Sequence, residues 1–155
     1  MKLLKSFLFK FLPIFVFIIF SINGEIIPEE IKYANALVTT PSGIKIYVEV
    51  ADTLLKRRLG LGKRSNLKRN WGMLFVFDKL KVHPFWMKHM NFALDIIWLD
   101  NHRIVHIIKN VNPVKSGETL PILKPLAPAN FVLEIAAGRA NELKLKKGDF
   151  LTYKF

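Results

Sequence analysis

A series of short apolar segments separated by turn residues is the feature that most restricts the fold of this chain. From residue 36 onwards these segments are only a few residues long, and Pro, Gly, Asn or Asp stands between them. Ile44, Ile46, Val48 and Val50 alternate with Lys, Tyr and Glu, which indicates a β-strand with one buried face. Short strands in series, rather than long helices, predict a mainly β chain.

The segments together predict an antiparallel barrel-like or sandwich domain with about seven strands and two short helices. Pro41-Ser42-Gly43 and Asp100-Asn101-His102 are turn sequences, so each joins two strands into a hairpin. Asp52 is expected to cap the first helix. Pro84 makes the segment around it an edge strand or a bulge. The predicted strands cover 36–40, 44–50, 72–77, 94–99, 103–108, 131–136 and 150–155, with the extended run 82–90 as an edge strand or a bulge, and the predicted helices cover 53–59 and 138–145.

The first 24 residues have the pattern of a targeting segment. Lys2, Lys5 and Lys10 precede Phe11–Ile22, a run of 12 residues without charge. A spanning helix needs about 20 apolar residues, so this run predicts a signal peptide, with an uncut signal anchor as the alternative. The chain is then divided into residues 1–24, a linker over 25–35 and a single β-rich domain over 36–155. We expect an exported protein, periplasmic or extracellular, that touches a membrane only through residues 1–24 if they stay attached.

The net charge and the absence of cysteine exclude several kinds of site and partner. The chain has 24 Lys and Arg against 12 Asp and Glu, and no Cys. A net charge of +12 on an exported protein predicts contact with an anionic component of the cell envelope, although solubility alone would also explain it. Nucleic acid is not expected, because the basic residues are scattered. No disulfide, cysteine nucleophile or thiolate metal site is available, and the four His lack ligand spacing, so we expect neither metal nor cofactor.

Charged residues inside apolar motifs are the best candidates for a site. Glu49, Lys88, Asp95 and Glu134 all have this setting, and Trp86 lies beside Lys88. Since a buried charge needs a partner, Lys88 and Asp95 either pair or converge on a ligand. A pocket beside Trp86 would bind a small ligand. The alternatives are a structural ion pair or charges on the solvent face of each strand.

Several motifs in one order resemble the domain of unknown function 192 family, also called uncharacterised protein family 0127. The resemblance covers residues 37–154 and implies a compact, mainly β domain with a barrel-like core, often exported, without a firmly assigned reaction. The motifs are Ile46-Tyr47-Val48-Glu49-Val50-Ala51-Asp52-Thr53, Arg58–Arg64, Gly72-Met73-Leu74-Phe75-Val76-Phe77-Asp78, Phe85-Trp86-Met87-Lys88, Leu94-Asp95-Ile96 and Leu133-Glu134-Ile135-Ala136-Ala137-Gly138. The chain departs from the family pattern at Gly62, His89-Met90, Ala93 and Arg139.

Three hypotheses for function remain open at this level, and whether the chain is an enzyme is undecided. The first is a binding module for a small ligand or an envelope partner near Trp86, Lys88 and Asp95, with the proline-rich loop 110–130 at its rim. Arg58 belongs to this candidate set because it stands near a Gly-Leu turn that could hold an anion. The second is a small hydrolase that uses a carboxylate pair. The third is a structural accessory protein.

Overall fold

The computed structural model describes residues 17–22, 25–115 and 117–155, and the chain divides into two units, Met1–Ile31 and Lys32–Phe155. In the first unit β1 (Phe17–Ile22) and β2 (Glu25–Glu30) pair antiparallel. Residues 25–30, assigned to a linker by the sequence, therefore form a strand. The greater part of the predicted signal peptide, residues 1–16 and 23–24, lies outside the described residues. No helix within the described ranges is long and apolar enough to cross a membrane.

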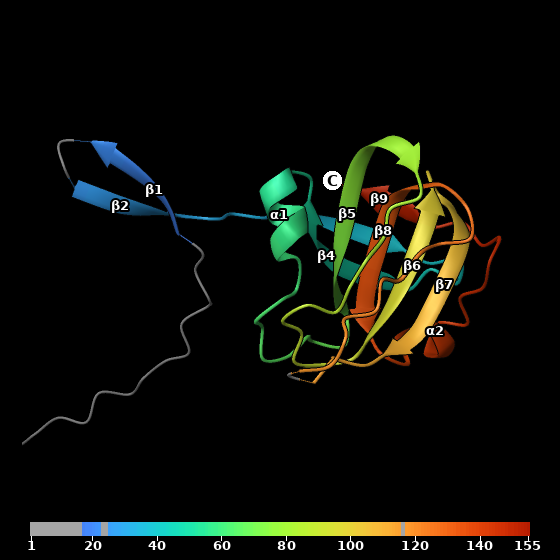
Figure 1. Cartoon of the computed structure of the whole chain (residues 1–155). Helices are drawn as coiled ribbons and strands as arrows, with labels where there is room; N and C mark the ends of the chain where they lie inside the picture. The colour runs from blue at the N-terminus through green and yellow to red at the C-terminus, as the bar shows by residue number, and fades with distance from the viewer. Residues whose placement is uncertain (1–16, 23–24, 116) are drawn as a thin grey trace, which may run out of the picture. The chain divides into compact units, whose positions relative to one another are not determined.

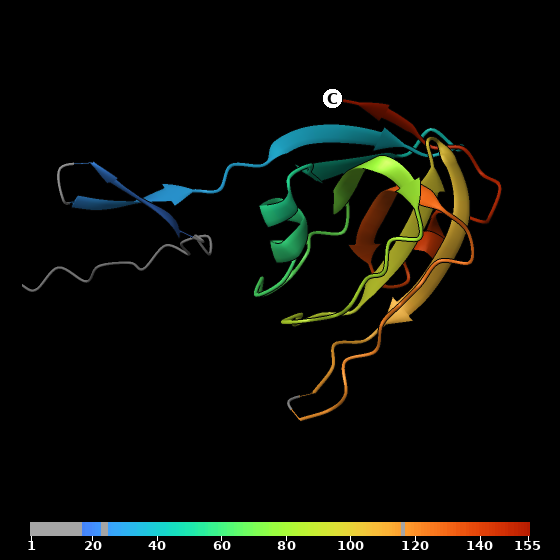
Figure 2. The same cartoon turned by 45° about the horizontal axis from the view of Figure 1, so that its top comes forward.

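The second unit is built on one seven-stranded sheet with the strand order β7-β6-β8-β5-β4-β3-β9. The sheet curls into a half-barrel, and two short helices accompany it (Figures 1 and 2). The predicted mainly β, barrel-like class is confirmed. The elements are β3 (Ala34–Thr39), β4 (Lys45–Ala51), α1 (Leu54–Leu59), β5 (Trp71–Lys81), β6 (Leu94–Asp100), β7 (Arg103–Val111), β8 (Ala129–Ala136), α2 (Arg139–Glu142) and β9 (Thr152–Lys154).

Both predicted hairpins are confirmed, because their turns are specified locally. β3 pairs antiparallel with β4, and β6 with β7. Gly43 takes the left-handed conformation in the first turn with φ of 82°, and Asn101 does so in the second with φ of 49°. Glycine and asparagine are the residues that accept this conformation at least cost.

The connection from β4 to β5 departs from the antiparallel pattern. These two strands are parallel, so the chain crosses back between them through α1 and the loop 60–70. The predicted cap at Asp52 is wrong: the Thr53 side chain accepts a hydrogen bond from the Lys56 amide at 3.2 Å. Asp52 instead pairs with the Lys56 ammonium at 2.9 Å, and that hydrogen bond lowers the pKa of Asp52.

The predicted strand over 82–90 is also wrong. Only Phe85 forms a β-bridge there, to Leu123 in the long loop between β7 and β8. Phe85 and Met87 are buried against the sheet, whereas Trp86 and Lys88 are exposed. Buried and exposed residues therefore alternate in this segment because it packs across the sheet, although it does not join the sheet.

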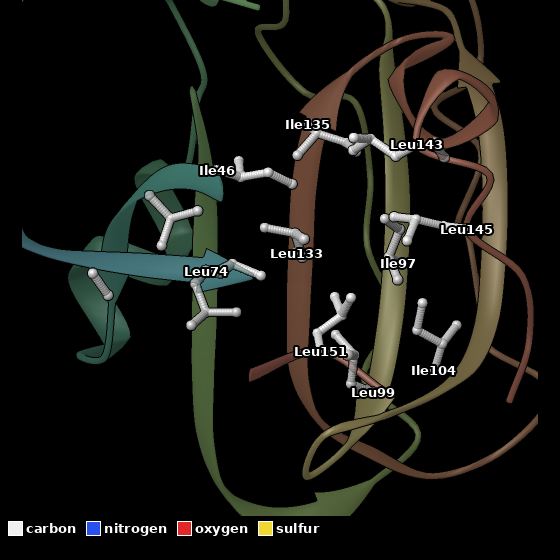
Figure 3. Close-up of a cluster of buried hydrophobic side chains, with 14 of the residues drawn as sticks. Ile46, Leu74, Ile97, Leu99, Ile104, Leu133, Ile135, Leu143, Leu145 and Leu151 are labelled. Carbon is white, nitrogen blue, oxygen red and sulfur yellow. The ribbon is translucent and has the colours of Figure 1, made fainter. Parts of the chain in front are cut away.

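Two hydrophobic clusters cover the two faces of the sheet. The inner cluster fills the curl and is closed by α2 and the segment after it (Figure 3). The outer cluster lies under α1, the loop after α1 and the segment around Phe85 and Met87. Its members include Met73, Phe75 and Trp98. Because both faces are covered, β5, β6 and β8 read as nearly continuous apolar runs.

Backbone hydrogen bonds link the two end strands of the sheet. The amide of Ile104 donates to the carbonyl of Asp149, and the amide of Gly148 donates to the carbonyl of Ile104, both at 2.8 Å. The amide of Leu151 donates to the carbonyl of His102, also at 2.8 Å. These bonds connect the start of β7 to the segment that leads into β9. The half-barrel is thus fastened where its edges approach one another, which leaves less of either edge unpaired.

Candidate functional site

Glu134 is the most unusual ionisable residue of the second unit. It lies on β8 and is only 5% exposed, on the same face of that strand as Val132 of the outer cluster. Burial among apolar side chains raises the pKa of its carboxyl from 4.5 to about 8, although the Arg64 guanidinium acts in the opposite direction. Glu134 is therefore largely protonated and uncharged at neutral pH.

Glu49 stands in the same row across the sheet. Met73 on β5 is in register with Glu49 on β4 and with Glu134 on β8, so one strand separates the two carboxylic acids. Two strand spacings of about 4.8 Å place their Cα atoms roughly 10 Å apart. Met73 between them is fully buried and forms an apolar floor.

Arg64 and Tyr33 complete this group. The Arg64 guanidinium donates a hydrogen bond to the Glu49 carboxylate and lies 5.7 Å from the centre of the Tyr33 ring. Burial is the largest cause that raises the pKa of Tyr33. The side chains of Arg64 and Glu49 are 31% and 23% exposed, so this pair can be reached from solvent. We name Tyr33, Glu49, Arg64 and Glu134 the acid–arginine cluster.

The loop that carries Arg64 is held by the segment 89–91. The Lys63 amide donates to the His89 carbonyl at 2.7 Å, and the Asn91 side chain donates to the Arg64 carbonyl at 2.8 Å. A Cβ atom on Gly62 would lie 3.1 Å from the Leu59 carbonyl oxygen, so a larger residue there would press on the preceding turn. These contacts fix the backbone from which Arg64 reaches the cluster.

The cluster offers an unusual combination of hydrogen-bonding groups. Among the described residues no hydrogen bond reaches the Glu134 carboxyl, yet Nε of Arg139 is the one buried side-chain nitrogen or oxygen atom without a partner, so the Glu134 oxygens keep some contact with solvent. A protonated carboxyl can donate one hydrogen bond and accept others, the guanidinium donates, and the Glu49 carboxylate accepts. A ligand with several hydroxyl or amide groups could use all three.

Asp95 has a structural role. It is fully buried on β6, and its Oδ1 accepts from the amides of Asn110 at 2.8 Å and Gly138 at 3.2 Å. Its Oδ2 accepts from the amide of Ala140 at 2.7 Å. Asp95 thus fastens the start of α2 and the end of β7 to β6. Lys88 is exposed, and within the described part of the chain no ion pair joins it to Asp95.

The remaining predicted site residues lie elsewhere. Trp86 is 46% exposed, on the segment that is bridged to Leu123 in the loop 110–130. Arg58 is exposed on α1. Its neighbour Arg57 donates to the Val76 carbonyl at 2.7 Å. The described residues contain no group of three His, Asp or Glu side chains suited to a metal ion.

Sequence reasoning identified Glu49 and Glu134 but missed Arg64 and Tyr33. Arg64 stands in a basic loop where nothing distinguishes it from its neighbours, and Tyr33 lies in the predicted linker. The one available signal for Arg64 is that Glu49 points away from the buried face of its strand and requires a cation nearby. Pairing between a loop and the outer face of a sheet leaves no periodic pattern.

The fold and the cluster define a class: a curled, mainly β domain whose outer sheet face carries a buried acid beside an arginine–glutamate pair. Residues 37–153 match the model of the DUF192 family, described as an uncharacterized ACR, and the chain belongs to that family. The resemblance seen in the sequence is therefore confirmed.

Curated relatives are similar over the same domain. A UPF0127 protein of Thermococcus gammatolerans is 30% identical over 112 residues, which are 69% of this chain and 66% of the relative. A UPF0127 protein of Thermococcus kodakarensis is 28% identical over 111 residues, which are 68% of this chain and 64% of the relative. The matched part of the chain thus spans just under two thirds of the length of each relative.

Two solved structures share the fold. A crystal structure from Sinorhizobium meliloti, of a protein named as a candidate transcription regulator, has a TM-score of 0.72 and 29% identity and covers 81% of this chain and 98% of its own. A protein of unknown function from Novosphingobium aromaticivorans has a TM-score of 0.66 and 28% identity and covers 88% and 92%.

Proposed function

We propose that this DUF192 protein is a binding module for a small polar ligand, held at the acid–arginine cluster. The observation that carries the proposal is the buried, uncharged carboxyl of Glu134 beside a solvent-reachable Arg64–Glu49 pair. The Glu134 carboxyl has no hydrogen-bond partner among the described residues and keeps some contact with solvent, so a ligand that displaces water there can bond to it. Acids with a strongly shifted pKa are concentrated at functional sites.

The chemistry of the cluster favours an uncharged, polyhydroxylated ligand such as a sugar unit of the cell envelope. A formal anion would have to compete with Glu49 for Arg64, whereas a hydroxyl can accept from the guanidinium and donate to Glu49 in place of water. Glu134 would donate to a second hydroxyl or to an amide carbonyl. Tyr33 supplies an aromatic wall, which sugars frequently contact.

The binding experiment uses the full chain and calorimetric titration with glucose, cellobiose, N-acetylglucosamine and chitobiose. We expect at least one of these to bind at millimolar concentration. Glu134→Leu should weaken binding about tenfold or more, because it removes a buried hydrogen bond worth about 1–3 kcal/mol. Glu134→Gln should retain most of the affinity, and Glu142→Gln, an exposed acid outside the cluster, is the matched control. The absence of binding, or equal binding by Glu134→Leu, would refute the proposal.

A small hydrolase is the second candidate, favoured by the separation of Glu49 and Glu134 across one strand. A protonated acid near a second carboxyl group is the combination that inverting glycosidases use as general acid and general base. Hydrolysis of chromogenic glycosides decides between the two functions. Turnover that disappears in both Glu49→Gln and Glu134→Gln would indicate catalysis, whereas binding without turnover supports the binding module.

We also propose that the protein is exported to the cell envelope, on the basis of the basic start and apolar run of residues 1–24. Expression of the full chain in a bacterial host, followed by fractionation and mass spectrometry of the N-terminus, tests this. The expected result is a periplasmic chain that begins at Glu25, or an intact chain in the membrane fraction if the segment is a signal anchor. An intact chain in the cytosol would contradict export.

A further inference from the structure

The end of β5 and the segment after it lie beside the loop before β8 on the outside of the second unit, joined by an isolated β-bridge between Phe85 and Leu123. The amide of Phe85 donates to the Leu123 carbonyl at 2.8 Å, and the amide of Leu123 donates back to Phe85 at 2.8 Å. The two segments run beside one another in both views (Figures 1 and 2). Antiparallel pairing at this bridge sets Trp86 opposite Ile122. We name residues 79–88 and 122–126 the Trp86 ribbon.

Alternation sends one set of ribbon side chains inward and the other outward. Phe85 and Met87 are 9% and 2% exposed, in the outer cluster, so Trp86 between them faces solvent. In the other segment Ile122, Lys124 and Leu126 are exposed, while Pro125 is buried. Alternation therefore sets Trp86, Lys88, Ile122, Lys124 and Leu126 on one side of the ribbon, whereas residues 79–82 are exposed without alternation.

That surface is unusually apolar for an exposed part of the second unit. The exposed fractions are Leu80 51%, Val82 48%, Trp86 46%, Ile122 62% and Leu126 82%. Single exposed apolar residues are ordinary, but five in two adjoining segments indicate an interaction surface. A tryptophan among exposed aliphatic residues is characteristic of the interfacial layer of a bilayer, where an amphipathic ring has one apolar and one hydrated side.

The positive charge of the ribbon indicates an anionic partner. Lys79, Lys81, Lys88 and Lys124 are exposed, and the ribbon contains no Asp or Glu. Among the described residues, none of these four lysines takes part in an ion pair. Lysines around an apolar centre let the alkyl stems follow the apolar side chains while the ammonium groups meet lipid phosphates.

We infer that the Trp86 ribbon docks the domain onto an anionic lipid bilayer, with Trp86, Ile122 and Leu126 in the interface and the lysines among the headgroups. The proposal is independent of the acid–arginine cluster. It adds a membrane contact within the folded domain, separate from residues 1–24. DNA fits less well, because its phosphates would offer no apolar contact to Ile122 and Leu126.

Co-sedimentation of the full chain with phosphatidylcholine vesicles, with and without phosphatidylglycerol, tests the inference. All variants keep residues 1–24, so any binding by that segment is common to them. We expect tight binding only with phosphatidylglycerol. The double variant Ile122→Ser, Leu126→Ser should bind at least tenfold more weakly, and each of Lys79→Gln and Lys124→Gln about fivefold more weakly. The controls are Phe150→Ser and Lys147→Gln, exposed positions outside the ribbon.

Quenching of tryptophan fluorescence by brominated lipid gives the second readout. We expect quenching in the wild-type chain and the loss of most of it in Trp86→Phe, since Trp98 is fully buried and Trp71 is partly buried outside the ribbon. Equal vesicle binding by the ribbon and control variants would overturn the inference. It would also be overturned if the ribbon variants kept full vesicle binding but lost binding to duplex DNA, which would make the surface a nucleic-acid contact.

Discussion

At the residue scale, Glu134 is the side chain on which the proposed binding site depends most. Its carboxyl is buried and largely uncharged, whereas Glu49, one strand away, is paired with Arg64. A buried acid with a raised pKa beside a charged pair is characteristic of functional sites. Sequence alone identifies both acids, because each interrupts an apolar motif. The pKa of Glu134 is raised by burial and lowered by Arg64, which only the folded loop brings near it.

The raised pKa of Glu134 predicts that stability falls as pH rises. Between 4.5 and about 8 the carboxyl is protonated in the folded chain and ionised in the unfolded chain, so folding takes up a proton. Stability from this group is complete below pH 4.5 and is lost through that interval, by about 1.4 kcal/mol per pH unit at most.

Urea denaturation of the wild type and of Glu134→Gln over this pH range provides the measurement. The difference in free energy of unfolding should shift by a few kcal/mol in favour of Glu134→Gln towards pH 8. Parallel pH profiles for the two chains would show that Glu134 ionises normally.

Asp95 is predicted to act on stability alone. An Asn at this position keeps one acceptor oxygen for the three amides that Asp95 now binds. Asp95→Asn should therefore lower the free energy of unfolding by about 1–3 kcal/mol. Chemical denaturation measures this, with the exposed Asp78→Asn as control. An unchanged midpoint for Asp95→Asn would contradict the structural role.

At the element scale, predictions from the sequence hold where the determinants are local. The hairpins follow from Gly43 and Asn101, and the strand predicted over 72–77 lies within β5. The parallel pairing of β4 with β5 was not predicted, because strand neighbours depend on the whole sheet. The segment 82–90 alternates like a strand, yet its partner is a loop, and alternation does not distinguish these cases.

The close approach of β5 and β8 depends on Gly72. A Cβ atom there would lie 2.5 Å from the Glu134 carbonyl oxygen and 3.0 Å from an Ile135 methyl carbon. Gly72→Ala should push the strands apart and cost about 1–3 kcal/mol. Hydrogen exchange should then accelerate at the amides of Met73 and Glu134. Gly43→Ala, with open space around it, is the control and should affect only its own turn; equal exchange in the two variants would contradict crowding at β5.

At the scale of the whole molecule, three features support the proposal that the protein is exported to the cell envelope. The chain starts with a basic and apolar segment, carries a net charge of +12 and presents an apolar, lysine-rich ribbon. The fold class was predictable because many short strands restrict it. The ribbon was not, because it needs residues nearly forty positions apart in the sequence to lie side by side. The sequence located Trp86 and Lys88, but their common surface with Ile122 and Leu126 comes from the fold.

The central claim is that Glu134 is an uncharged buried acid tuned by Arg64. A ¹³C NMR titration of the Glu134 side-chain carboxyl in the full chain tests this most directly. We expect the Glu134 carboxyl to titrate with a midpoint near pH 8. In Arg64→Gln the midpoint should be higher, since the guanidinium lowers the pKa of Glu134. A midpoint near 4.5, or one that does not respond to loss of Arg64, would contradict the account.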